Sequence, residues 1–214
     1  MRHVLMFLLL TGGLLGAEDD YLKLTAKQAA AIANAQRIGG QVGGSLDLRV
    51  ISTDRSYNYK LRATWMTPDV IRAVARLQQI THGLSDADTR KLVADAERAG
   101  DTVLMIELHG REGSGVIPSD WRAKLGPVGA GAEPARNVWG RNSPNLRGIP
   151  ALAGAARRDY AYDVFWMIFP LRTEAGAPLF GPADSEAELT VQVFDKVGRV
   201  RWRIPSSIRD QIHP

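Results

Sequence analysis

Apolar and polar residues alternate strictly along two stretches of this chain, and this alternation limits the possible folds more than any other feature. Over residues 57–65, Tyr, Leu, Ala and Trp alternate with Asn, Lys, Arg and Thr. Over residues 199–204, three arginines alternate with Val, Trp and Ile. Successive side chains of a β-strand point to opposite faces, so each stretch predicts a strand with one face on a core and one in water. The fold must therefore contain a sheet with a buried face.

Three other segments have the spacing of helices. Residues 67–83 begin with Thr67 as N-cap, followed by proline, and place their apolar residues on one face. Residues 85–100 begin with Ser85 as N-cap, and the aspartates that follow favour the positive end of a helix. These two segments predict a helical hairpin. An alanine-rich helix is also expected over 25–37.

The remaining segments predict further strands and several loops. Residues 45–52 are expected to pair with the alternating stretch that follows them. Three more strand regions are expected over 101–109, 160–171 and 188–205, the last as a hairpin turning at residues 195–198.

Glycine, proline and alanine mark the expected connections. The sequence GGQVGG over 39–44 predicts a flexible connection or tight turn. Residues 110–127 are expected to form a loop with a short helical turn. A long loop rich in Gly, Pro and Ala is expected at about 126–158, and a loop of this length is usually functional or mobile.

These elements together predict an α+β fold, with a mainly antiparallel sheet of about five to six strands and the helical hairpin packed on one face. A chain of 214 residues can bury a core without disulfides or metal. Composition shows no strong break along the chain. We therefore expect residues 18–214 to form a single domain.

The N-terminal residues have the order of a secretory signal peptide. Arg2 and His3 precede an apolar run over 4–16, and Ala17 stands before an acidic stretch. The run is shorter than the roughly 20 apolar residues that a membrane span needs. Residues 1–17 are therefore expected to be a removable signal peptide, with no transmembrane segment in the mature chain. A buried N-terminal helix is the alternative.

Two compositional features favour a bacterial location. The chain has no cysteine, so an exported fold would depend on its core rather than on disulfides. It also has no Asn-x-Ser/Thr acceptor, since proline follows Ser143. We expect a periplasmic or secreted protein of the bacterial envelope. The net charge of +4 is mild, and without Arg2 it is one unit lower.

The arginine row is the first candidate binding surface. Arg199, Arg201 and Arg203 would project from one strand face about 6.6 Å apart. If the other alternating strand joined the same sheet, Lys60 and Arg62 could extend this basic face. Each basic residue near an anionic surface contributes about 1 kcal/mol, so three are weaker than the ~4 kcal/mol of a millimolar complex. A solvated strand face that binds nothing is the stronger interpretation.

Tryptophans supply a second candidate. Trp65, Trp166 and Trp202 lie on strand faces expected to be interior. Trp139 lies instead in the long loop, and the stretch that follows it contains two further candidate residues, Arg141 and Arg147. This composition suits a binding loop, and equally a loop that packs one tryptophan onto the core.

A third candidate lies at the end of the strand expected over 101–109. Glu107 and His109 share one strand face, and Glu112 follows in the loop. Two carboxylates and an imidazole are ligands for zinc or iron, and can perform acid–base chemistry. The spacing matches no strong metal-binding pattern. A structural histidine is the more frequent case.

The sequence therefore favours an exported envelope protein with a non-catalytic binding or structural role. An exported hydrolase or metal-dependent enzyme centred on Glu107, His109 and Glu112 is the alternative. The sequence predicts no cofactor, since the phosphate-binding loop and the dinucleotide glycine motif are both absent. The expected partner, if any, is a weakly bound anionic surface or polymer.

Overall fold

The computed structural model describes residues 19–42, 59–110, 117–129 and 136–212. Its helices and two antiparallel sheets confirm the predicted α+β class. The sequence predicted one sheet of five to six strands, whereas the strands are divided between a five-stranded and a four-stranded sheet. The proposed signal peptide and the strand expected over 45–52 lie outside the described residues.

The five-stranded sheet has the order β1-β2-β3-β7-β6, and every neighbouring pair is antiparallel. Its strands are β1 (Arg37–Val42), β2 (Tyr59–Met66), β3 (Thr102–Gly110), β7 (Asp163–Phe169) and β6 (Arg141–Asn142). The four-stranded sheet has the order β5-β4-β8-β9 and is also antiparallel. Its strands are β5 (Val138–Trp139), β4 (Arg122–Pro127), β8 (Glu186–Val193) and β9 (Lys196–Arg203).

The two sheets pack face to face around one hydrophobic core, which contains the inward residues of both alternating strands. Trp65 is fully buried at its centre, and Trp202 packs against it from the opposite sheet with 5.8 Å between ring centroids. Polar groups also join the sheets. The Tyr59 hydroxyl donates to the Val191 carbonyl at 2.8 Å, and burial raises the pKa of Tyr59 to about 12.

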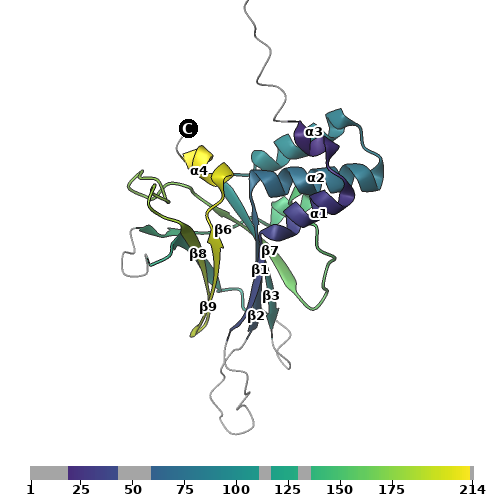
Figure 1. Ribbon diagram of the computed structural model, residues 1–214. Helices are drawn as coiled ribbons and strands as arrows, with labels where there is room; N and C mark the ends of the chain where they lie inside the picture. Colours follow the sequence, from purple (N-terminus) through teal and green to yellow (C-terminus); the bar gives the residue numbers. More distant parts are fainter. Residues whose placement is uncertain (1–18, 43–58, 111–116, 130–135, 213–214) are drawn as a thin grey trace, which may run out of the picture.

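The outer face of the five-stranded sheet is covered at one end by helices α1 (Ala26–Ala35), α2 (Pro68–His82) and α3 (Asp86–Glu97). Figure 1 shows the three helices gathered beside that end of the sheet. The predicted N-caps are confirmed, since the Thr25, Thr67 and Ser85 side chains each accept from a first-turn N–H. No helix in the described part of the chain combines the length and apolar character needed to cross a bilayer.

Short helices complete the fold. Within the described residues, the 3-10 helices include η1 (Asp20–Lys23), η5 (Pro144–Gly148) and η6 (Pro150–Leu152). The α-helix α4 (Ser206–Ile212) follows β9. The segment expected as a long loop at about 126–158 therefore contains β5, β6, η5 and η6 in its described part, separated by irregular residues.

Three local predictions were wrong. GGQVGG does not form a turn where it is described, because its first residues belong to β1. Most of the later part of the loop expected over 110–127 is the strand β4. The final hairpin turns at Phe194 and Asp195 rather than at residues 195–198, and its glycine, Gly198, pairs with Val191 inside the ladder.

The chain crosses from the four-stranded to the five-stranded sheet at Gly140, between β5 and β6. A Cβ atom at this position would lie 2.5 Å from Cζ of the fully buried Phe169. Only glycine therefore lets the backbone pass this close to the core. The crossing sends the residues on either side of Gly140 to different sheets.

Candidate functional site

A pocket of about 600 Å³ lies on the outer face of the five-stranded sheet, beside the end that α1, α2 and α3 cover. Its volume is typical of sites for small molecules. β3, β7 and the segment 147–162 supply its walls. The lining residues are Met105, Glu107, Arg147, Ala153, Ala156, Arg157, Arg158, Asp159, Tyr162, Asp163, Val164, Phe165 and Trp166.

One wall of the pocket is apolar and firmly held. Met105 of β3 and Trp166 of β7 are cross-strand partners, so their side chains lie next to each other on this face. The Trp166 indole N–H donates to the Leu152 carbonyl at 2.9 Å. This bond fixes η6 against the sheet. A ligand would therefore meet a rigid apolar surface here.

Beside this wall, Glu107 is held by Arg37 of β1. The guanidinium donates to both carboxylate oxygens, from Nε at 2.9 Å and from Nη2 at 2.8 Å. Glu107 is only 5% exposed. Its hydrogen bonds raise the pKa of Arg37. A bidentate pair of this kind satisfies the buried charge that would otherwise be costly to place in the sheet.

A second network fixes the rim of the pocket through Arg62 of β2. Its guanidinium pairs with Asp159 at 3.1 Å and lies 3.8 Å from the ring centroid of Tyr162. The Ala161 N–H, together with Arg62, holds the pKa of Asp159 below its usual value. The Tyr162 ring also packs against the His109 ring, with 5.2 Å between centroids and an angle of 37° between the ring planes. These contacts anchor the segment that precedes β7.

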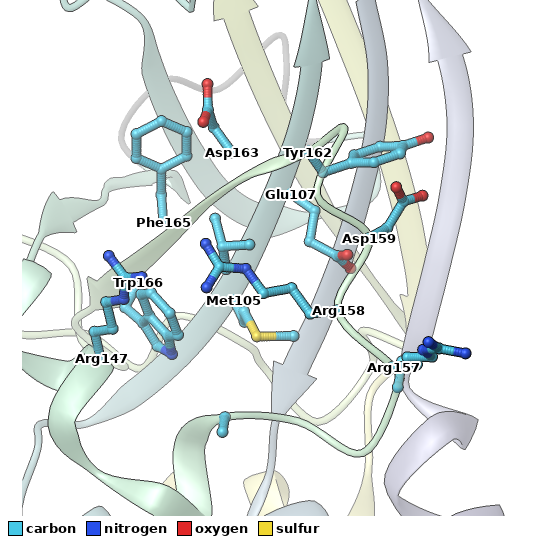
Figure 2. Close-up of a pocket in the computed structure, with 13 residues that line it drawn as sticks. Met105, Glu107, Arg147, Arg157, Arg158, Asp159, Tyr162, Asp163, Phe165 and Trp166 are labelled. Carbon is cyan, nitrogen blue, oxygen red and sulfur yellow. The ribbon is translucent and has the colours of Figure 1, made fainter.

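Three other arginines of the pocket differ from Arg37 and Arg62, which pair with Glu107 and Asp159. Among the described residues, no carboxylate pairs with Arg147, Arg157 or Arg158. Figure 2 shows the Arg158 guanidinium over the middle of the pocket, with Arg147 and Arg157 on opposite sides of it. The Arg158 guanidinium also lies 5.0 Å from the ring centroid of Tyr160. The pocket thus combines unpaired positive charge with an apolar wall.

The charges of the pocket determine which kind of ligand it can bind. A guanidinium presents planar, fixed donors that match the two oxygens of a carboxylate or phosphate. Of the three pocket carboxylates, Glu107 and Asp159 are already bonded to arginines, and Asp163 is exposed at the start of β7, so the three arginines Arg147, Arg157 and Arg158 outnumber the one remaining carboxylate. The open positions therefore suit an anion rather than a cation.

The arginine row lies on one face of a strand, as predicted, but Lys60 and Arg62 do not lie beside it. Arg199, Arg201 and Arg203 are exposed on β9, and the intervening Val200 and Trp202 are buried. Lys60 and Arg62, however, belong to the other sheet, on the face that points away from the four-stranded sheet. The condition under which they could extend the basic face, that the two strands join one sheet, is not met, because the two strands lie in different layers.

The loop residues proposed as one site are separated by the crossing at Gly140. Trp139 lies on β5 and is 55% exposed, so it does not hold the loop to the core. Arg141 lies on β6 of the other sheet. Arg147 lines the pocket. Only Arg147 of these three contributes to the pocket.

Glu107 and His109 lie on one face of β3, as expected from their spacing. Their contacts are internal: Glu107 binds Arg37, and the His109 Nδ1–H donates to the Ala161 carbonyl. Glu112 lies outside the described residues. Throughout the described ranges, this region included, no group of three or more His, Asp or Glu is placed to hold a metal ion.

The segment that supplies most of the pocket was not among the candidate sites predicted from the sequence. Arg157, Arg158, Asp159 and Tyr162 come from the stretch RRDYAYD, directly before β7. Adjacent charges and tyrosines at the start of an apolar strand were the available signal. The chain matches no family model, and comparisons with curated proteins and with solved structures give no significant match.

Proposed function

We propose that this chain is an exported bacterial envelope protein that binds a small organic anion in the pocket, without catalysing a reaction on it. The observation that carries the proposal is the set of three pocket arginines, Arg147, Arg157 and Arg158. Each lacks a carboxylate partner in the described part of the chain. Arginines that face a concave site without such partners are a favourable environment for an oxyanion.

The proposed ligand has two parts. A carboxylate or phosphate group would be held by the guanidinium groups. An apolar or aromatic body would pack on Met105, Val164 and Trp166, which line the same pocket. This combination describes an aryl or alkyl carboxylate, or a phosphate monoester.

The state of two of the three pocket carboxylates, Glu107 and Asp159, supports binding rather than catalysis. A general base must be free to accept a proton from the substrate. Both oxygens of Glu107 accept from Arg37, and Asp159 is held by Arg62 and the Ala161 N–H. These groups support the walls of the pocket and are less suited to chemistry or metal binding.

The binding proposal predicts that phenyl phosphate binds the wild-type protein and that phenol does not. Arg158→Ser is expected to weaken phenyl phosphate binding by about 10-fold or more, because a hydrogen bond to a charged group contributes about 1.5–3 kcal/mol. Isothermal titration calorimetry would measure both affinities. Arg203→Ser is the matched control, since Arg203 is an exposed arginine outside the pocket. Equal binding by wild type and Arg158→Ser would contradict the proposal.

Export is supported by the order of the first twenty residues and predicts a processed protein. Expression of the whole chain in a bacterium should yield a periplasmic protein that begins near Glu18, as measured by intact mass. Replacing Leu8 and Leu9 by arginine interrupts the apolar run and should leave the full-length chain in the cytoplasm. A full-length wild-type chain found only in the cytoplasm would contradict export.

A further inference from the structure

The outer face of the four-stranded sheet is a second charged surface, separate from the pocket. Its outward residues on β9 are exposed, while the inward residues of β8 and β9 are buried. β4 adds the outward residues Arg122 and Lys124 to the same face. The face therefore presents five basic residues, Arg122, Lys124, Arg199, Arg201 and Arg203.

The strand register arranges part of this face as a row that runs across the strands. Trp139 pairs with Lys124, Lys124 pairs with Thr190, and Thr190 pairs with Arg199. One residue from each of the four strands therefore lies in line. Neighbouring strands are about 4.8 Å apart, so the row is about 14 Å long. We call these four residues the cross-strand row.

The acidic residues Glu186 and Glu188 lie on the side of the cross-strand row where Arg201 and Arg203 are found. Glu188 lies beyond the row and binds Arg201 at 2.8 Å, with a longer contact of 3.5 Å to Arg199. Glu186 pairs with Arg203 in the strand register. Acidic residues therefore lie beside all three β9 arginines, with Glu188 paired to both Arg199 and Arg201, whereas the strand partners of Lys124 are Trp139 and Thr190. On the other side of the row, Arg122 bonds to Gln192 and lies 5.2 Å from the Trp139 ring centroid.

We propose that the cross-strand row binds a linear acidic polysaccharide whose chain runs across the strands, rather than along the arginines of β9. Lys124 and Arg199 would contact the carboxylates of the polymer. Trp139 is 55% exposed and offers an amphipathic ring on which a sugar ring can pack. The hydroxyl of Thr190 lies between the two cations and can bond to sugar hydroxyls.

The positions of the exposed apolar side chains on this face favour a polymer over a bilayer. The exposed apolar side chains of the face, Trp139 and Val197, stand on opposite edge strands with polar residues between them. A bilayer surface requires a common apolar patch that can enter the interface. The choice of a polysaccharide over a nucleic acid rests on the proposed export, since an envelope protein meets acidic sugar polymers.

The test is binding of polygalacturonate oligomers to the whole chain, measured by calorimetry. Two ionic contacts, made by Lys124 and Arg199, would weaken binding by about 10-fold between 50 and 200 mM salt. Lys124→Ser and Arg199→Ser are each expected to weaken binding about fivefold, and Trp139→Ala about 10-fold, whereas Trp139→Phe keeps most of the affinity. Arg203→Ser is the matched control and should change the affinity less than twofold. Circular dichroism would confirm that each variant is folded.

Several results would overturn the proposal. An equal loss in Arg199→Ser and Arg203→Ser would indicate a diffuse charge effect without a row. Tighter binding of an oligothymidylate would identify a nucleic-acid surface, and binding only to phosphatidylglycerol vesicles would identify a membrane surface. Absence of polygalacturonate binding would also reject it. Arg158→Ser separates the two proposals, since it should abolish phenyl phosphate binding and leave polymer binding unchanged.

Discussion

Replacing Trp65 by alanine is expected to lower the free energy of unfolding by about 3–5 kcal/mol, the usual cost of removing a large aromatic side chain from a core. Trp65 is fully buried between the sheets. Its ring packs against Phe180 and Trp202, with centroid distances of 6.0 and 5.8 Å. Its indole N–H also donates to the buried Thr102 hydroxyl at 2.7 Å. The substitution would therefore leave both a cavity and an unpaired hydroxyl.

Urea denaturation followed by circular dichroism measures this loss. Trp139→Ala is the matched control, because the same side chain is removed from an exposed position. Its free energy of unfolding should change by about 0.5 kcal/mol or less, as is usual for surface substitutions. A loss below about 1 kcal/mol in Trp65→Ala would contradict the packing of the two sheets around this residue.

Replacing Arg37 by methionine is also expected to cost about 3–5 kcal/mol, because removing one partner leaves the Glu107 carboxylate buried and unpaired. Glu107 is 5% exposed and depends on Arg37 for both of its charge-assisted bonds. The double variant Arg37→Met with Glu107→Met should recover most of the lost stability. Two apolar residues of similar volume can replace a buried ion pair with little net cost.

Arg90 and Asp19 provide a control with similar geometry and different burial. They form a bidentate pair at 3.0 and 2.8 Å, but both side chains are about half exposed. Water can solvate either charge when its partner is lost, so Arg90→Met should be much less destabilising than Arg37→Met. Equal effects of the two substitutions in urea denaturation would contradict the role of burial at Glu107.

Much of the fold could be predicted because it depends on local patterns. The alternation of arginines with Val200, Trp202 and Ile204 gives the observed burial of β9. The side chains of Thr67 and Ser85 give the starts of α2 and α3. In each case the residues that predict the strand or helix belong to the same short stretch that forms it.

The errors arose where structure depends on distant partners. Gly39 indicates a turn by its own preference, but it lies in β1 beside Arg62, and a Cβ there would come within 3.2 Å of the Arg62 Cγ. The division of the strands into two sheets likewise depends on which strands pair with each other. Alternation predicts that a strand has a wet face, but it does not assign that face to a particular layer. The sequence therefore left open whether Lys60 and Arg62 share a face with the arginines of β9, and the pairing places them in the other sheet.

The pocket could not be predicted because its parts are far apart in sequence. Arg147 and Arg158 reach it from a segment that was expected to be irregular, and Met105 reaches it from β3. Arg37 and Glu107 are 70 residues apart. No spacing rule connects such positions when only one sequence is considered. Their proximity follows from the order of β1, β2, β3 and β7 in the sheet.

The most direct test of the proposed binding site is an NMR titration of the arginine side-chain Nε–H signals with phenyl phosphate. We expect the signals of Arg147, Arg157 and Arg158 to shift together and saturate, while those of the exposed β9 arginines do not move. Unchanged pocket signals, or shifts confined to Arg199, Arg201 and Arg203, would contradict the proposal that the pocket is the anion-binding site.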